Sequence, residues 1–203
     1  MRAGALERAF DVALGVSVVS WGALRLATAP AAARFGVVTL TLVAVNACVG
    51  VLFLARAPAV EHGPSRAIVE SVPSMVAGGV ALSIAPPPES WRVGAQIAFA
   101  SGGALAVLSL VSLGRSFAIL PALRKIVRRG AYRVVRHPVY VGELAMVAAC
   151  GAARADALAL VVVLAAVAAS VARIHAEERL LVKDAEYTEY ARDVRWRLVP
   201  RIW

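Results

Sequence analysis

Long apolar stretches alternate with short polar segments along most of the chain. Four apolar stretches of 17 to 21 residues fill the first half, and each ends near a proline, a glycine or a charged residue. About 20 apolar residues are needed for a helix to cross the hydrocarbon core of a bilayer. We therefore predict four transmembrane helices, over residues 12–28, 35–55, 67–85 and 93–113.

Two further apolar stretches lie close together in the second half. Residues 139–153 and 157–172 are joined by a short turn that contains Arg154 and Asp156, which predicts a helical hairpin. The first stretch would be only about 22 Å long as a helix, so the number of complete crossings stays open. The expected fold is an all-α, polytopic transmembrane helical bundle of five to six spans, with a cytoplasmic C-terminal region that binds a cofactor.

Composition and charge agree with a membrane protein. Of the 203 residues, 60% are hydrophobic and 17% are charged, whereas soluble domains have about 45 to 50% and about 25%. The net charge of +9 comes from basic residues in short segments between apolar stretches, where they contact anionic lipid headgroups. We therefore expect membrane lipids as partners and no nucleic acid. Cys48 and Cys150 lie within apolar stretches, so we interpret them as packing residues and expect no metal site.

The distribution of basic residues predicts the orientation. Eighteen of the 22 lysines and arginines fall on one side of the predicted spans and four on the other. Because cytoplasmic loops carry the excess of basic residues, both termini are expected in the cytoplasm. Glu7 and Asp11 are unusual for a signal peptide, so we interpret the first stretch as a span. The abundance of Ala and Arg indicates a GC-rich bacterium, and we expect the protein in the bacterial inner membrane.

The chain divides into N-terminal transmembrane helices over residues 1–113 and a region with candidate chemistry over residues 114–203. Two polar segments, 114–143 and 173–203, flank the predicted hairpin and are expected to meet in space. Pro138 suits the first turn of a helix, whose free amides would bind anionic groups. Arg173 and Glu177 share a helix face. Glu177 and Glu178 project about 100° apart, so that one can face a pocket and the other a neighbouring wall.

Several polar or small residues lie inside the predicted spans. The pairs Gly78-Gly79 and Gly102-Gly103 are interpreted as sites of close helix packing, because neither follows a strand as a nucleotide-binding loop would. Glu70 and Asn46 are costly in a membrane and often functional. For Glu70, exposure at the membrane interface is an equally good interpretation.

Several motifs in the second half occur together in a fixed order. They comprise Leu113-Gly114-Arg115-Ser116-Phe117, Gly130-Ala131-Tyr132-Arg133, Arg136-His137-Pro138-Val139-Tyr140-Val141-Gly142, Arg173 with Glu177-Glu178 and Leu181, and Tyr187, Tyr190 and Val199-Pro200. Together they resemble the isoprenylcysteine carboxyl methyltransferase (ICMT) family of integral membrane enzymes, over about the last 90 residues. The chain has Asp184-Ala185 where the family commonly has a glycine.

This resemblance implies a methyltransferase that uses S-adenosyl-L-methionine and acts on a lipophilic small molecule or lipid. Arg173 is the first candidate to orient the acceptor. Glu177 or Glu178 would act as a base only for an amine or an alcohol, because a carboxylate acceptor needs none. The residues that the resemblance places around the cofactor are Tyr132, Arg136, His137, Pro138, Tyr140, Gly142, Glu177 and Glu178.

Two alternatives remain at this point. Membrane sterol reductases share the segment from Arg136 to Glu143 and the ending from Arg195 to Pro200, and their cavity holds NADPH, although those reductases are much larger. A non-catalytic membrane subunit would leave Arg136, His137 and Glu177 free to vary. The methyl acceptor, its accepting atom and the oligomeric state are left open by the sequence.

Overall fold

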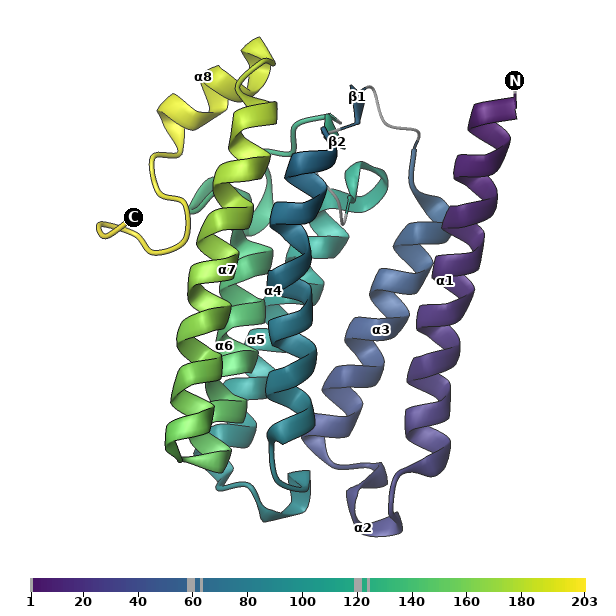
Figure 1. Ribbon diagram of the computed structural model, residues 1–203, viewed down its shortest axis with the longest axis vertical. Coiled ribbons are helices and arrows are strands. Elements are labelled where there is room, and N and C mark those ends of the chain that lie inside the picture. The colour runs from purple at the N-terminus through teal and green to yellow at the C-terminus, as the bar shows by residue number, and fades with distance from the viewer. Residues whose placement is uncertain (1, 58–60, 63, 119–121, 124) are drawn as a thin grey trace.

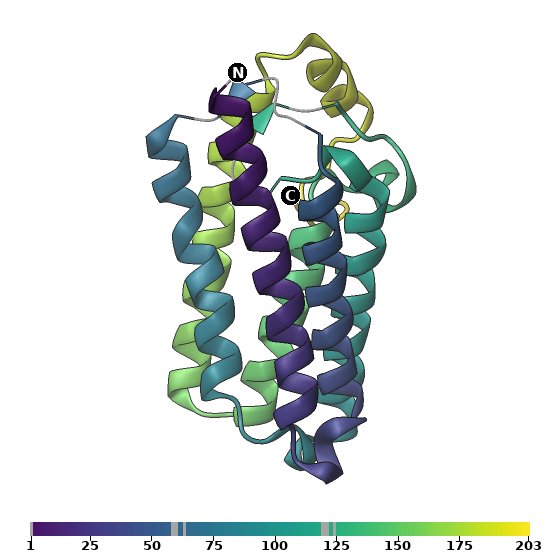
Figure 2. The same ribbon diagram turned by 90° about the vertical axis from the view of Figure 1, so that its right-hand side faces the viewer.

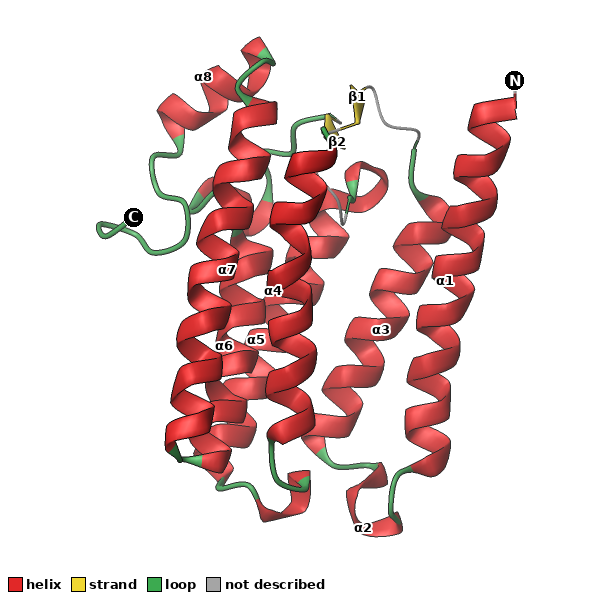
Figure 3. Ribbon diagram, in the orientation of Figure 1, coloured by secondary structure: helices red, strands yellow, loops and turns green. Residues whose placement is uncertain are grey.

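The fold is a bundle of long helices that lie side by side (Figures 1 and 3). A computed structural model describes residues 2–57, 61–62, 64–118, 122–123 and 125–203. In this part of the chain, six helices have 17 or more residues: α1 (Arg2–Thr28), α3 (Val37–Ala55), α4 (Ser65–Ile84), α5 (Val93–Leu113), α6 (Pro138–Arg154) and α7 (Ala157–Leu181).

Short elements connect the long helices or follow the last of them. They are α2 (Ala31–Arg34), α8 (Ala185–Asp193), and the 3-10 turns η1 (Pro88–Ser90), η2 (Gly114–Ser116) and η3 (Gly130–Arg133). Strands β1 (Glu61–His62) and β2 (Ala122–Leu123) pair in antiparallel fashion, with Glu61 opposite Leu123. This pair joins the α3–α4 connection to the α5–α6 connection.

The predicted polytopic helical bundle is confirmed. Four helical segments in the described residues are long and apolar enough to cross a membrane, namely 8–28, 37–55, 93–116 and 157–181. In α4 the apolar part is the shorter Val69–Ile84, and α6 has 17 residues, about 25 Å of helix. Helix α5 has the predicted bounds, whereas α7 continues beyond the predicted end at residue 172 as far as Leu181.

The helices pack as an open arc around a central space. Helix α1 packs on α3, α3 on α5, α5 on α6, α6 on α7, and α4 on α7 and α6, whereas α3 and α4 make no extensive contact over the described residues. The view in Figure 2 shows the same upright bundle from the side of α1. Helices α1 and α4 therefore form the two ends of the arc.

Glycines permit a close backbone contact between α5 and α6. A Cβ atom on Gly142 would lie 2.5 Å from the Gly102 carbonyl oxygen, and one on Gly102 would lie 2.7 Å from the Gly142 carbonyl oxygen. The predicted packing role of Gly102-Gly103 is confirmed, since Gly103 also meets Thr41. The same prediction for Gly78-Gly79 is wrong. Cβ atoms there would meet nothing within 4 Å, because both residues line the central cavity described below.

The polar segments gather at one end of the bundle. The N-terminus, the strand pair and α8 lie at the top of Figure 1, and α2 lies at the opposite end. The predicted meeting of the two polar segments is confirmed by their backbones, because the Arg136 amide donates to the Trp196 carbonyl at 2.9 Å and the His137 amide donates to the Arg197 carbonyl at 3.0 Å. At this end, Glu70 of α4 accepts from Arg66 at 2.8 Å and pairs with Arg179 of α7, so it ties two helices together.

Candidate active site

The His-Pro turn forms the start of α6. His137 is the N-cap residue and Pro138 the first helical residue, as its missing amide allows. The amides of Tyr140 and Val141 both donate to the His137 carbonyl, at 3.1 and 3.3 Å. The predicted set of free amides is therefore reduced to that of Val139, which has no backbone partner among the described residues. Val139 lines the cavity.

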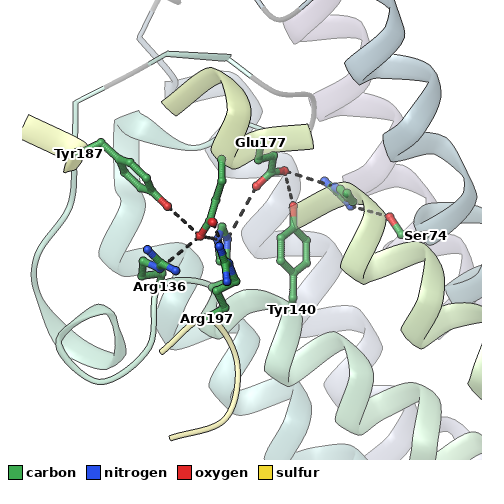
Figure 4. Close-up of polar contacts among 9 residues, drawn as sticks. Ser74, Arg136, Tyr140, Glu177, Tyr187 and Arg197 are labelled. Atoms are coloured by element: carbon green, nitrogen blue, oxygen red, sulfur yellow. Dashed lines mark hydrogen bonds and ion pairs between the residues drawn. The ribbon is translucent and has the colours of Figure 1, made fainter. Parts of the chain in front are cut away.

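Glu178 is the centre of a buried polar cluster that joins four segments (Figure 4). Arg197 Nε donates to its Oε2 at 2.7 Å and the Tyr187 hydroxyl donates to its Oε1 at 3.0 Å. His137 Nε2 lies 3.1 Å and Arg136 Nε 3.2 Å from the same Oε1. Because a carboxylate can only accept, these contacts require the proton of His137 to lie on Nε2. The Glu178 carboxylate thus fixes the turn before α6, α8 and the C-terminal segment around the end of α7.

Glu177 belongs to a second cluster that faces the inside of the bundle (Figure 4). The Tyr140 hydroxyl donates to Glu177 Oε1, and Arg173 Nε lies 3.4 Å from the same oxygen. The buried Arg173 guanidinium also donates to Ser74 Oγ at 3.2 Å, and its carbon lies 4.9 Å from the centre of the Tyr140 ring. The ion pair with Glu177, the hydrogen bond to Ser74 and the cation–π contact with Tyr140 together hold this arginine in one orientation.

Three tyrosines supply an aromatic wall between η3 and α8. The Tyr190 hydroxyl donates to the Tyr132 carbonyl at 2.7 Å, and burial raises the pKa of Tyr190 to about 12. Burial also raises the pKa of Tyr132 and of Tyr187. All three phenols therefore stay neutral near pH 7, and those of Tyr187 and Tyr190 donate hydrogen bonds. Outside this wall, Arg128 donates to Glu189 at 2.8 Å and is partly exposed.

A cavity of about 520 Å³ runs from these clusters into the bundle, within the size range of ligand pockets. Its walls come from α3, α4, α5, α6, α7 and α8. The polar end is lined by Lys125, Tyr132, Arg136, His137, Tyr140, Glu143, Arg173, Glu177, Tyr187 and Tyr190. The deeper part is mostly apolar and is lined by residues such as Leu42, Val45, Asn46, Val49, Met75, Leu82, Phe99, Leu110, Met146 and Val147.

Most of the predicted site residues lie together. Tyr132, Arg136, His137, Tyr140, Arg173 and Glu177 line the cavity. Pro138, Gly142 and Glu178 lie behind its wall: Pro138 is fully buried, Gly142 packs on α5, and Glu178 holds the surrounding segments. The prediction that the two adjacent glutamates face different surroundings is confirmed, since Glu177 lines the cavity and Glu178 does not.

Sequence reasoning missed several residues of the site. The sequence presents Arg197 and Tyr187 only as members of motifs, without a role, yet both bind Glu178. Ser74, which binds Arg173, lies in an apolar stretch that offered no signal. Glu143 appears only in the segment shared with membrane sterol reductases, and its place in the cavity wall could have been suspected because it shares a helix face with Tyr140.

The described residues thus define an all-α membrane protein whose polar site opens into an apolar cavity. Residues 95–183 match the model of the Isoprenylcysteine carboxyl methyltransferase (ICMT) family, which confirms the resemblance seen in the motifs. This segment is ICMT-like, and the match supports a role of the protein as a membrane methyltransferase. The match extends from α5 to just beyond α7 and includes both glutamates, whereas Arg197 lies outside it. No curated protein matches the chain. The sterol reductase alternative gains no support.

Proposed function

We propose that this protein transfers a methyl group from S-adenosyl-L-methionine to a lipophilic acceptor at the cytoplasmic face of the membrane. The observation that carries the proposal is the continuity of one cavity from the charged and aromatic end into the apolar interior. A polar donor and a lipophilic acceptor can meet in such a cavity, and the surrounding helices exclude water from their junction.

The residues at the polar end suit the chemical groups of this donor. Arg136, Lys125 and the free Val139 amide can bind a carboxylate, and Glu177 can bind an ammonium group. The faces of Tyr132, Tyr187 and Tyr190 suit an adenine ring. When bound, the donor supplies a methyl group activated by a positively charged sulfur. The carboxylate of Glu177 and the nearby aromatic rings would stabilise that positive charge.

The deeper part of the cavity suits the apolar portion of the acceptor. Because α3 and α4 line this part without extensive contact between them, a lipophilic molecule would reach it sideways from the bilayer. Arg173, which is held by Glu177, Tyr140 and Ser74, would orient the acceptor at the junction. Methyl transfer is an in-line displacement, so alignment of the two reactants is the main contribution of the protein.

Calorimetric titration of the detergent-solubilised protein tests the donor. We expect S-adenosylhomocysteine, the demethylated product of the donor, to bind with a micromolar Kd, and NADPH to bind at least tenfold more weakly. Micromolar binding of NADPH without binding of S-adenosylhomocysteine would overturn the proposal in favour of a reductase.

The acceptor can be sought without assuming its identity. Bacterial lipid extracts would be incubated with the protein and a donor labelled in its methyl group, and labelled products would be identified by mass spectrometry. A Glu177→Gln variant serves as the control, because it removes the carboxylate at the polar end and should abolish labelling. Labelling that is equal with both proteins would show that the products do not arise at this site.

A further inference from the structure

Glu143 lies where the polar end of the cavity meets its apolar part. On α6, Tyr140, Glu143, Val147 and Cys150 are spaced by three or four residues and all line the cavity, as residues on one helix face do. Tyr140 belongs to the polar cluster, whereas Val147 and Cys150 belong to the apolar core. Glu143 is therefore the first side chain on this face that an acceptor would meet beyond the predicted donor site.

The Glu143 carboxylate differs from the two glutamates of α7 in having no fixed partner. It is exposed in the cavity wall and makes no hydrogen bond or ion pair with the described residues. Glu177 is already bound by Tyr140 and Arg173, and Glu178 lies behind the wall with four partners. Of the two acids described in the cavity lining, Glu143 has both oxygens available for a ligand, whereas Oε1 of Glu177 is already bound.

Arg173 attracts and Glu177 repels the charge of the Glu143 carboxylate, so the effects of these two neighbours on it oppose one another. Arg173 and Glu177 also pair with one another, with Arg173 Nε 3.4 Å from Glu177 Oε1. Two further basic residues, Arg136 and Lys125, line the cavity. Arg136 Nε lies 3.2 Å from Glu178 Oε1. A second carboxylate beside Glu143 would be repelled, whereas an amine, hydroxyl or thiol could donate a hydrogen bond to it.

We propose that Glu143 is the general base of the methyl transfer and that the acceptor is a lipophilic amine, alcohol or thiol rather than a carboxylic acid. This inference rests on the proposed function. As the new bond forms between the methyl carbon and the accepting N, O or S atom, the bond from carbon to the donor sulfur breaks and its electron pair stays on sulfur. The proton of the accepting atom passes to the Glu143 carboxylate, so charge and atoms balance.

A transfer assay tests the base directly. The probes are dodecylamine, dodecanol, dodecanethiol and dodecanoate, each offered with methyl-labelled donor. We expect label on at least one of the first three and none on dodecanoate. Glu143→Gln should lower that rate about 100-fold, the scale of general base catalysis, and Glu143→Asp should restore part of it. The matched control, Glu89→Gln, alters an exposed acid at the opposite end of the bundle and should change nothing.

A binding measurement separates this inference from the proposed function. S-adenosylhomocysteine affinity should stay within threefold in Glu143→Gln; a tenfold loss would assign Glu143 to the donor site instead. Dodecylamine should bind the wild-type protein at least tenfold more tightly than dodecanoate, and Glu143→Gln should abolish this preference. Equal or tighter binding of dodecanoate, or its methylation, would overturn the inference. Failure of the wild-type protein to bind S-adenosylhomocysteine would instead overturn the proposed function, and the amine preference could still be measured.

Discussion

Arg197 and Glu178 form an ion pair of 2.7 Å that attaches the C-terminal segment to the end of α7. The same guanidinium lies 5.3 Å from the centre of the Trp203 ring. The backbone carbonyl of Arg197 accepts a hydrogen bond from the His137 amide. The last residues of the chain therefore support the His-Pro turn from behind, although they contribute no side chain to the cavity lining.

Replacing Arg197 by Ala should loosen this support. A hydrogen bond to a charged group contributes about 1.5 to 3 kcal/mol, so we expect a loss of stability on that scale and about tenfold weaker binding of S-adenosylhomocysteine. Thermal unfolding in detergent and calorimetric titration measure the two effects. Arg201→Ala is the control, because Arg201 is exposed in the same segment. Similar results for both variants would show that general charge loss, rather than the pair with Glu178, is responsible.

Replacing His137 by Ala should impair donor binding more than replacing Arg128 does. His137 lines the cavity and lies 3.1 Å from Glu178, whereas Arg128 pairs with Glu189 on the outside of α8. We expect at least a tenfold loss of S-adenosylhomocysteine affinity for His137→Ala and less than a twofold loss for Arg128→Ala. Equal losses would indicate that the basic residues act only as a membrane anchor.

Adding one methyl group at Gly142 should separate α5 from α6. The new Cβ would lie 2.5 Å from the Gly102 oxygen and 2.7 Å from the Ala106 amide nitrogen, and a backbone cannot yield as a flexible side chain does. We expect Gly142→Ala to lower the free energy of unfolding by about 1 to 3 kcal/mol. Gly94→Ala, in a helical position of α5 with nothing within 4 Å, should be neutral or slightly stabilising. A stable Gly142→Ala variant would contradict the close packing.

The pH dependence of stability should report on the cap of α7. Asp156 accepts the Ala159 amide at 2.8 Å, and this hydrogen bond lowers the pKa of its carboxyl. A lowered pKa in the folded state means that the contribution is complete above the unfolded-state pKa of about 3.9 and is lost as pH falls through the folded-state value. Asp156→Ala should therefore melt below the wild type at pH 7, and the difference should shrink below about pH 4. If the difference in melting temperature between the variant and the wild type stayed the same at both pH values, the charged form of Asp156 could not be its cause.

The helices could largely be predicted from sequence because their ends carry strong signals. Helix α5 begins after Arg92 and ends before Gly114, whose φ of 52° favours glycine, and both bounds were predicted. The end of α7 was missed, because its apolar run stops while the helix continues through Arg173, Glu177 and Glu178. A change from lipid to headgroup surroundings ends the hydrophobic pattern without ending the helix.

The cavity could not be predicted in the same way. Its apolar lining looks like any other transmembrane sequence, so nothing distinguishes Met75 or Leu82 from residues that face lipid. The Gly78-Gly79 pair shows the difficulty, since the same residue type that brings α5 against α6 leaves open space on α4. The role of Arg197 could not be predicted either. Its contact with Glu178 depends on how the C-terminal segment folds back onto α7 and not on residue spacing along one helix.

The open arc of helices also bears on how this protein could be redesigned. Side chains in a close-packed core are costly to change, because each loses contacts or strains its neighbours when its volume changes. Residues that face the cavity from α3 and α4 have open space before them instead of an opposing helix. The shape of the cavity can therefore be altered through Val45 or Met75 at little expense to the fold, which makes these positions suitable starting points for changing which molecules the cavity accepts.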